Sequence, residues 1–228
     1  QSTLDAVLAE VEPLVSRTAA MLVAPRRSVD VSVSLGGGRE LRGTVAGIHG
    51  TTLVSIGYSK MGPKQQLSAW IGLLALACAH PERPWTAVAV GRRDPGRPTS
   101  ASFGPLDEKQ ARTHLIDLVD LYDRGMREPL PLFCQTSAAY AQAAHGGQDA
   151  ELAGRRAWES EWNFDHEDRE LEHQLVLGGE LPFSRVLGLA PQAGEDGPDW
   201  RHDELTRFGR LARRLWDGLL ACEQVSAR

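Results

Sequence analysis

The stretch LRGTVAGIHGTTLVSIGYSKMGPKQQLSAWIGLLALA, residues 41–77, decides the fold. Its two apolar runs, 41–48 and 52–58, are separated by His49-Gly50, a pattern typical of two strands joined by a tight turn. A helical pattern follows over residues 64–79, with apolar side chains nearly all round it. A helix of that kind is expected to be buried, so the stretch predicts a strand pair followed by a core helix.

The segments on either side extend this pattern. Residues 29–35 alternate apolar and polar side chains, which predicts a strand with one buried face, and Gly36–Gly38 turns the chain back. With the two runs above, this makes an antiparallel meander. Residues 85–91 form a continuous apolar strand suited to a sheet interior, and Asp107 with Gln110 marks the start of a further helix. After an opening helix, the order α-β-β-β-α-β-α predicts an α/β fold in which a mixed sheet is flanked by helices.

Composition narrows the function classes. The chain has 228 residues, 42% hydrophobic and 24% charged, as in an ordinary globular protein with a substantial core. Its net charge of −5 argues against a general polyanion binder, so any contact with nucleic acid requires a local basic patch. No apolar run is long enough for a membrane span. The three separated cysteines lack a CxxC pair and are expected to be reduced, which favours a cytoplasmic protein. The missing initiator Met suggests a piece of a longer chain.

The second half of the chain has a different character. We expect an α/β core over residues 1–128 and a mostly helical extension over 129–228 packed on it. Within the extension, 136–162 is alanine-rich and predicted to be helical, and 163–204 is acidic and irregular. A last helix is predicted, with an apolar face turned inward that consists of Leu205, Phe208, Ala212, Leu215, Trp216 and Leu219. Its arginines are expected to lie mostly off that face: Arg207, Arg210, Arg213 and Arg214.

The deciding stretch also carries the pattern of a nuclease without its chemistry. Nucleases of the PD-(D/E)xK class need two acids on neighbouring strands, which hold Mg²⁺, and a lysine two residues after the second acid. The stretch resembles the nuclease domain of the RecB type, with Ala46 at the first acid, Gly57 at the second and Ser59 at the lysine. Gln66 and Trp70 keep its Gln-x-x-x-aromatic element. This resemblance implies a restriction-endonuclease-like core with no catalytic residues, no metal and no cofactor.

Three blocks in order, residues 43–92, 118–141 and 207–223, carry a more specific resemblance. They are similar to the C-terminal domain of the exodeoxyribonuclease V gamma subunit, RecC, in its actinobacterial form. The resemblance implies a nuclease-like fold that has lost catalysis. It also implies assembly with the RecB and RecD subunits in a machine that unwinds and degrades DNA ends during double-strand-break repair. In that family the domain lies next to RecD and the DNA fork.

Two alternatives remain open at this stage. Asp30 lies on the first predicted strand, and Glu40 with Arg42 forms an acid-x-basic triplet, so a metal-dependent nuclease with a rearranged site is one alternative. A DNA-independent interaction module is the other. The acidic run 165–170 lacks regular ligand spacing and is expected to be a solvated loop.

Basic and aromatic side chains supply the candidates for binding. We expect most of Trp158, Trp162, Trp200 and Trp216 to be core, whereas an exposed pair would anchor a partner subunit. The segment after residue 91 is predicted to be a basic loop. The candidates for DNA contact are Arg26, Arg27, Arg39, Arg42, Arg92, Arg93 and Arg97.

Overall fold

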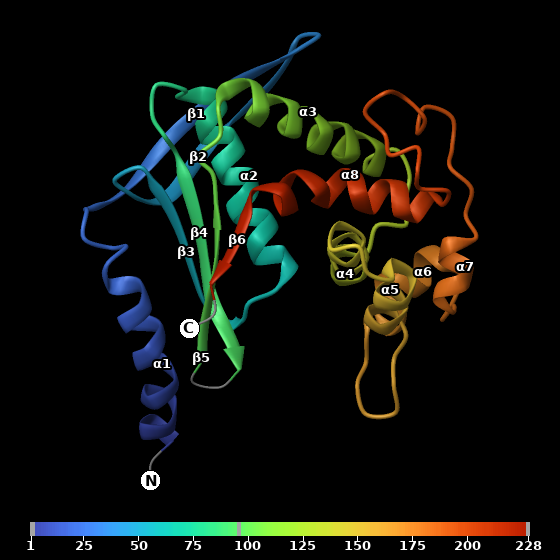
Figure 1. The fold of residues 1–228 in the computed structure, drawn as a ribbon, viewed down its shortest axis with the longest axis horizontal. Coiled ribbons are helices and arrows are strands. Elements are labelled where there is room, and N and C mark those ends of the chain that lie inside the picture. The colour runs from blue at the N-terminus through green and yellow to red at the C-terminus, as the bar shows by residue number, and fades with distance from the viewer. Residues whose placement is uncertain (1–2, 95–96, 227–228) are drawn as a thin grey trace. The chain divides into compact units, whose positions relative to one another are not determined.

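The computed structural model describes residues 3–94 and 97–226, and the chain forms two compact units (Figure 1). One unit comprises the chain up to Ile116 together with the chain from Cys222 onward, and the other comprises Asp117–Ala221. The division falls inside helix α3 (Glu108–Gly125), whereas the core predicted from the sequence ends at residue 128. In the part of the chain that the structure describes, no helix is both long and apolar enough to span a membrane.

The first unit is built on a six-stranded mixed sheet, with the strands in the order β1-β2-β3-β4-β5-β6. Neighbouring strands are antiparallel except for β3 and β4, which are parallel. The predicted α/β class, the antiparallel meander and the core helix are thereby confirmed. The elements of this unit are α1 (Thr3–Ala19), β1 (Arg26–Gly36), β2 (Arg39–His49), β3 (Thr52–Lys60), α2 (Pro63–Ala79), β4 (Thr86–Asp94), β5 (Arg97–Phe103), the first part of α3, and β6 (Glu223–Ser226).

Two strands were not predicted. The basic loop expected after residue 91 is instead the end of β4 and the start of β5, which pair as a hairpin through Arg92 and Pro98. Strand β5 was missed because its sequence, RPTSASF, contains a proline and mostly small polar residues, a weak strand pattern. Strand β6 is four residues long, and its Glu223 pairs with Phe103 of β5. Its position at the end of the sheet (Figure 1) depends on a partner that is remote in sequence.

Helices α1 and α2 cover opposite faces of this sheet. A Cβ atom on Gly72 of α2 would lie 2.6 Å from Leu53 Cδ2, so α2 packs directly on β3. Leu14 of α1 packs against Val88 of β4, which is in register with Val54, the neighbour of Leu53. Because successive strand residues point to opposite faces, the two helices lie on opposite sides. The predicted sheet flanked by helices is therefore present.

The start of α3 follows the predicted capping pattern. Gln110 N donates to Asp107 Oδ1 at 2.8 Å, and Asp107 N donates to Gln110 Oε1 at 3.2 Å. Each of these bonds satisfies a backbone N–H at the helix start, which fixes where the helix begins.

The second unit is helical. Its elements are the rest of α3, α4 (Cys134–His145), α5 (Ala150–Trp158), the 3₁₀ turn η1 (Glu167–Arg169), α6 (Leu171–Leu177), α7 (Phe183–Leu187) and α8 (Arg207–Cys222). Three of the four tryptophans of this half are buried, as predicted, whereas Trp162 is 97% exposed. The buried core cluster consists of Phe133, Tyr140, Trp158, Phe183, Val186, Phe208 and Ala212.

The acidic run 165–170 is only partly the solvated loop expected from its charge, since Asp165, Arg169 and Glu170 are exposed but the two acids between them are not. Glu167 is buried and accepts hydrogen bonds from the backbone N–H groups of Gln135 (2.9 Å) and Thr136 (2.7 Å) at the start of α4. Asp168 is also buried and accepts from Ser160 N at 2.9 Å. Carboxylates are stabilised at helix N-termini, where free N–H groups and the helix dipole favour negative charge.

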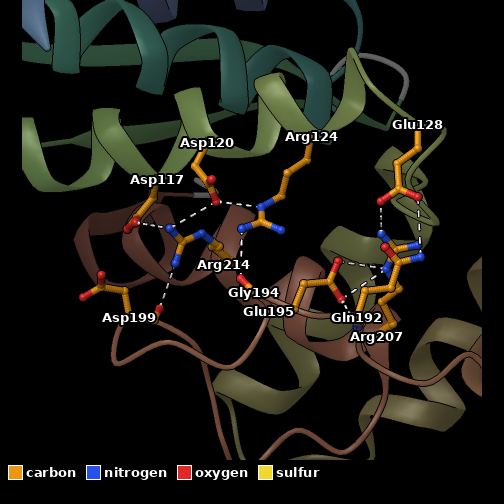
Figure 2. A network of polar contacts seen from close by, with 10 residues as sticks. All are labelled: Asp117, Asp120, Arg124, Glu128, Gln192, Gly194, Glu195, Asp199, Arg207 and Arg214. Atoms are coloured by element: carbon orange, nitrogen blue, oxygen red, sulfur yellow. Dashed lines mark hydrogen bonds and ion pairs between the residues drawn. The ribbon is translucent and has the colours of Figure 1, made fainter. Parts of the chain in front are cut away.

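The arginines of α8 also depart from expectation, since they lie partly inside the second unit (Figure 2). Arg207 is buried and donates from Nε to the fully buried Glu195 at 2.9 Å and from Nη2 to Glu128 at 2.6 Å. The side chain of Arg214 donates to Asp117 at 2.9 Å. The sequence pattern placed these cations outside because it does not reveal their acidic partners. Leu205, expected to point inward, precedes α8 and is 82% exposed.

Candidate functional site

A hollow of about 500 Å³ opens in the first unit between β2, β3 and α2. Residues 44–47 of β2 line one side and 53–56 of β3 line the other. Ser68 and Ile71 of α2 form part of its wall, and Arg26 at the start of β1 lies at its border. The hollow contains the position at which the nuclease pattern requires its first acid.

The hollow exists because β2 leaves β3 early. Ile48 pairs with Leu53 and His49 with Thr52, and along the described residues the pairing goes no further. Gly47 lies at the break, with a φ of +83° at an irregularity in the β1–β2 register. A bulge of this kind bends a strand, and its left-handed backbone favours glycine. Figure 1 shows the β1–β2 hairpin leaning away from β3 and β4.

The positions of the nuclease pattern carry no metal ligands and are not all in the hollow. Ala46, which the resemblance aligns with the first acid, is exposed and lines the hollow with a methyl group. Gly57 lies instead against the side chain of Gln65, and a Cβ atom on this glycine would require the amide end of that side chain to move. The Gln65 amide donates to Ser59 Oγ at 3.2 Å and accepts from Gly62 N at 3.2 Å. A neutral amide therefore lies beside Gly57 and bonds to Ser59, the two residues that the resemblance aligns with the second acid and the lysine.

Gln66 and Trp70, the retained motif residues, make contacts inside the first unit. Gln66 Nε2 donates to Glu223 Oε1 of β6 at 2.6 Å. Burial raises the pKa of Glu223, and the bond from Gln66 acts in the opposite direction. Trp70 is 1% exposed, with its ring centroid 6.1 Å from Phe103 and 5.5 Å from His114. Both motif residues thus join α2 to its neighbours.

The alternative metal site is not assembled. Asp30 is paired in register with Thr44, four residues from Glu40, which separates the two acids by roughly 13 Å along the hairpin. Asp30 accepts from Thr44 Oγ1 at 2.6 Å. Glu40 is bonded to Arg42 at 2.7 Å and to Ser32, and these bonds, Arg42 first, hold the pKa of Glu40 below its ordinary value. Two carboxylates that share one ion must approach it to within about 2–2.6 Å. Over the described residues, no group of three His, Cys, Asp or Glu side chains could hold a metal ion.

Two of the arginines predicted to contact DNA are only partly exposed and bind neighbouring elements. Arg27 Nη2 donates to Gly50 O at 2.6 Å, which fastens the start of β1 to the turn between β2 and β3. Arg92 pairs with Glu10 of α1, and its guanidinium lies 4.2 Å from the centroid of the Tyr58 ring. The ion pair of Arg92 joins α1 to the sheet.

The other five arginines are exposed and do not form a single patch. Arg26 is in register with His49, whereas Arg42 is in register with Ser32, which separates the two arginines by roughly 20 Å along the hairpin. A second group flanks the connection between β4 and β5, where Arg93 lies 4.0 Å from Asp94. The exposed members are Arg26, Arg39, Arg42, Arg93 and Arg97.

The sequence interpretation missed two residues that shape the site. Gln65 was not singled out, although Gly-Pro followed by a glutamine at the third helical position is a recognisable helix start. Gly47 was not recognised as a bulge, because a lone glycine in a strand pattern gives only a weak signal for one. The opening of the hollow depends on Gly47, and Gln65 occupies the space beside Gly57.

The family model and the known proteins that match this chain all carry the same name, RecC. A family model described as the RecC C-terminal domain matches residues 1–145. The "RecBCD enzyme subunit RecC" of Mycobacterium tuberculosis, in strains CDC 1551 / Oshkosh and ATCC 25618 / H37Rv, is 43% identical over 195 residues, 85% of this chain and 17% of that protein. The protein of the same name from Mycolicibacterium smegmatis is 41% identical over 200 residues, 87% of this chain and 18% of that protein. The chain thus spans 17% to 18% of the length of these relatives.

Proposed function

The chain belongs to the RecC C-terminal domain family, and from this premise we propose that it is a catalytically inactive nuclease-like domain that acts by binding. Its place is the RecC subunit of a RecBCD-type helicase–nuclease. There it acts as a scaffold for assembly with RecB and RecD and helps to guide DNA at the fork. Its core is restriction-endonuclease-like, with β2, β3 and α2 carrying the degenerate site.

One observation carries the loss of catalysis. The three positions that would hold acid, acid and lysine hold Ala46, Gly57 and Ser59, and the Gln65 side chain fills the space next to Gly57. A Mg²⁺ ion needs oxygen ligands in near-octahedral geometry, and proteins hold it through one or two carboxylates. A methyl group, a glycine and a neutral amide do not provide such a site. The remaining role of the fold is to present surfaces.

The exposed arginines support the DNA-guiding part of the proposal. Arg93 and Arg97 flank the connection between β4 and β5, and Arg39 and Arg42 lie near the tip of the β1–β2 hairpin. Exposed guanidinium groups bind phosphates without reading sequence, and each contact adds to the salt dependence of binding. Because the net charge of the chain is −5, such contacts are expected to be local and weak in isolation.

A cleavage assay tests the loss of catalysis. Labelled forked DNA is incubated with the purified chain and Mn²⁺, beside Glu40→Ala and Asp30→Ala variants. We expect no cleavage by any of the three proteins. Cleavage by the parent that disappears in Glu40→Ala or Asp30→Ala would establish the rearranged nuclease and overturn the proposal.

An assembly assay tests the scaffold role. Full-length RecC with and without this domain is co-expressed with RecB and RecD of the same organism, and the composition of the purified complex is measured. Loss of one or both partners on removal of the domain is expected. Retention of both partners in normal proportion, by a shortened RecC that remains folded, would contradict the scaffold role.

A further inference from the structure

The hollow is bordered by two strand edges that have no strand partner. On the side that faces β3, residues 42–46 of β2 pair with no strand in the described part of the chain. The same holds for residues 54–58 of β3 on the side that faces β2. On its other side, the β2 segment is paired with β1 throughout, and the β3 segment is paired with β4 as far as Ile56, so both are held extended over most of their length. Their free N–H and C=O groups therefore point into a common gap.

The outer edge of the sheet is treated differently. On β1, Asp30 O bonds to His80 Nε2 at 2.9 Å, and Ser34 O accepts from Arg112 Nη1 at 2.5 Å. Side chains of other elements thus occupy carbonyl groups of this edge, a common way to prevent unwanted pairing. The gap between β2 and β3 has no corresponding cover among the residues that the structure describes.

The lining of the gap favours a polypeptide over a nucleic acid. Apolar side chains are exposed beside it, with Ile56 at 47% and Ile71 at 40% exposure. The polar groups of the lining are small hydroxyls such as those of Ser55 and Ser68, and Arg26 is its one charged residue. A nucleic acid strand carries a phosphate at every nucleotide and requires several cations along its path. An extended peptide requires backbone partners and shallow apolar pockets for alternate side chains.

We propose that an extended segment of a partner subunit adds to the sheet in this gap, as a strand between β2 and β3. The inference rests on the proposed scaffold function and names how the partner is held. Since β2 and β3 are antiparallel, the added strand is antiparallel to one of them and parallel to the other. Side chains of the segment on one face lie against Ile71 and Ser68, so small or apolar residues at alternate positions fit best.

Hydrogen exchange tests the strand directly. Amide exchange is compared between full-length RecC alone and RecC assembled with RecB and RecD. Amides of residues 42–46 and 54–58 that face the gap are expected to exchange about tenfold or more slowly in the complex, because each becomes hydrogen-bonded. Amides of residues 87–90 of β4 are the control, since that strand is already paired on both sides. Unchanged exchange in both test segments of an intact complex would overturn the strand and leave the scaffold role standing.

A pair of substitutions on α2 tests the location. Ser68→Trp fills the hollow from an exposed position, and Lys64→Trp adds the same side chain one turn earlier, outside it. Weaker association of RecC with its partners by about tenfold, or 1.4 kcal/mol, is expected for Ser68→Trp and no change for Lys64→Trp. Equal association of both variants would place the partner elsewhere and overturn the inference.

Amide exchange also tests the alternative that the gap between β2 and β3 binds DNA rather than a peptide. Forked DNA is added to RecC without RecB or RecD, and exchange of residues 42–46 and 54–58 is measured again. No slowing is expected. Slowing of both segments by DNA alone would mean that the gap holds nucleic acid, and the peptide proposal would fail. Normal assembly of a RecC that lacks the whole domain would instead refute the underlying scaffold function.

Discussion

At the scale of a single residue, Glu223 is the hydrogen-bond partner of Gln66, one of the two retained motif residues. In the resemblance to active nucleases, the glutamine of the motif belongs near a metal and DNA. Here Gln66 binds the Glu223 carboxylate at 2.6 Å and so connects α2 to β6. Burial raises the pKa of that carboxyl above its ordinary value of 4.5, and the bond from Gln66 offsets only part of this shift. The negative charge on Glu223 therefore lowers the stability of the folded state.

The sign of this shift gives a pH prediction for Glu223→Gln. A carboxyl whose pKa is raised in the folded state favours folding below its unfolded pKa, and that contribution is lost as the pH rises through the folded pKa. The neutral variant keeps an acceptor for Gln66 and avoids the partly buried charge. We therefore expect it to melt at a higher temperature than the parent at pH 7, with the difference shrinking as the pH falls toward about 4.

Thermal melts of Glu223→Gln at several pH values check this prediction. Glu12→Gln, at an exposed position of α1, controls for the loss of one negative charge. A Glu223→Gln variant less stable than the parent at pH 7 would show that the charged form of the Gln66 bond outweighs the cost of burial.

At the scale of an element, the path of β2 depends on Gly47. A left-handed φ of +83° at the irregularity between Ala46 and Ile48 allows the bulge that directs β2 away from β3. A Cβ atom at Gly47 would also lie 3.1 Å from Val54 O, closer than such atoms normally approach. The hollow, its free strand edges and the separation of Ala46 from Gly57 all follow from this one irregularity.

Gly47→Ala is expected to destabilise the chain by about 2 kcal/mol, the sum of a left-handed penalty of about 1 kcal/mol and a similar cost for crowding Val54 O. Gly38→Ala is the matched control, because Gly38 has a φ of +78° and no atom within 4 Å of its Cβ position. Urea denaturation of both variants isolates the crowding cost as their difference. Equal free energies of unfolding for the two variants would contradict a close approach between β2 and β3 at this point.

Elements whose pattern is local could be predicted from the sequence, and elements fixed by remote partners could not. The period-two run of β1, the apolar β4 and the all-round apolar α2 are properties of consecutive residues. In contrast, β6 is a strand because Phe103 offers it an edge, and Arg207 is buried because Glu195 and Glu128 meet its guanidinium. The missing acids at Ala46 and Gly57 were visible in the sequence, whereas the Gln65 amide above Gly57 required the structure.

At the scale of the whole molecule, the sheet of the first unit contains five strands that precede the second unit in the sequence and one strand, β6, that follows it. Strand β6 pairs with β5 through Ala101 and Phe103, so its removal exposes the β5 edge and the Gln66 amide. A chain ending at Cys222 is therefore expected to show faster amide exchange in β5 and a lower melting temperature of the first unit. Amides of α4 in the second unit are expected to be unaffected.

A chain shortened by only its last two residues controls for truncation itself. Exchange in β5 that is the same in both shortened chains would mean that β6 contributes little to the sheet. Faster exchange across α4 as well as β5 would mean that the two units unfold together rather than separately.

The return of the chain to its first sheet has a consequence during synthesis. Residues 3–103 are translated well before β6, and the whole second unit emerges from the ribosome between them. The nascent protein therefore carries an unprotected β5 edge for the time that the ribosome needs to make residues 117–222. An edge of this kind is open to pairing with other chains, so synthesis of β6 closes a site at which misassembly can begin.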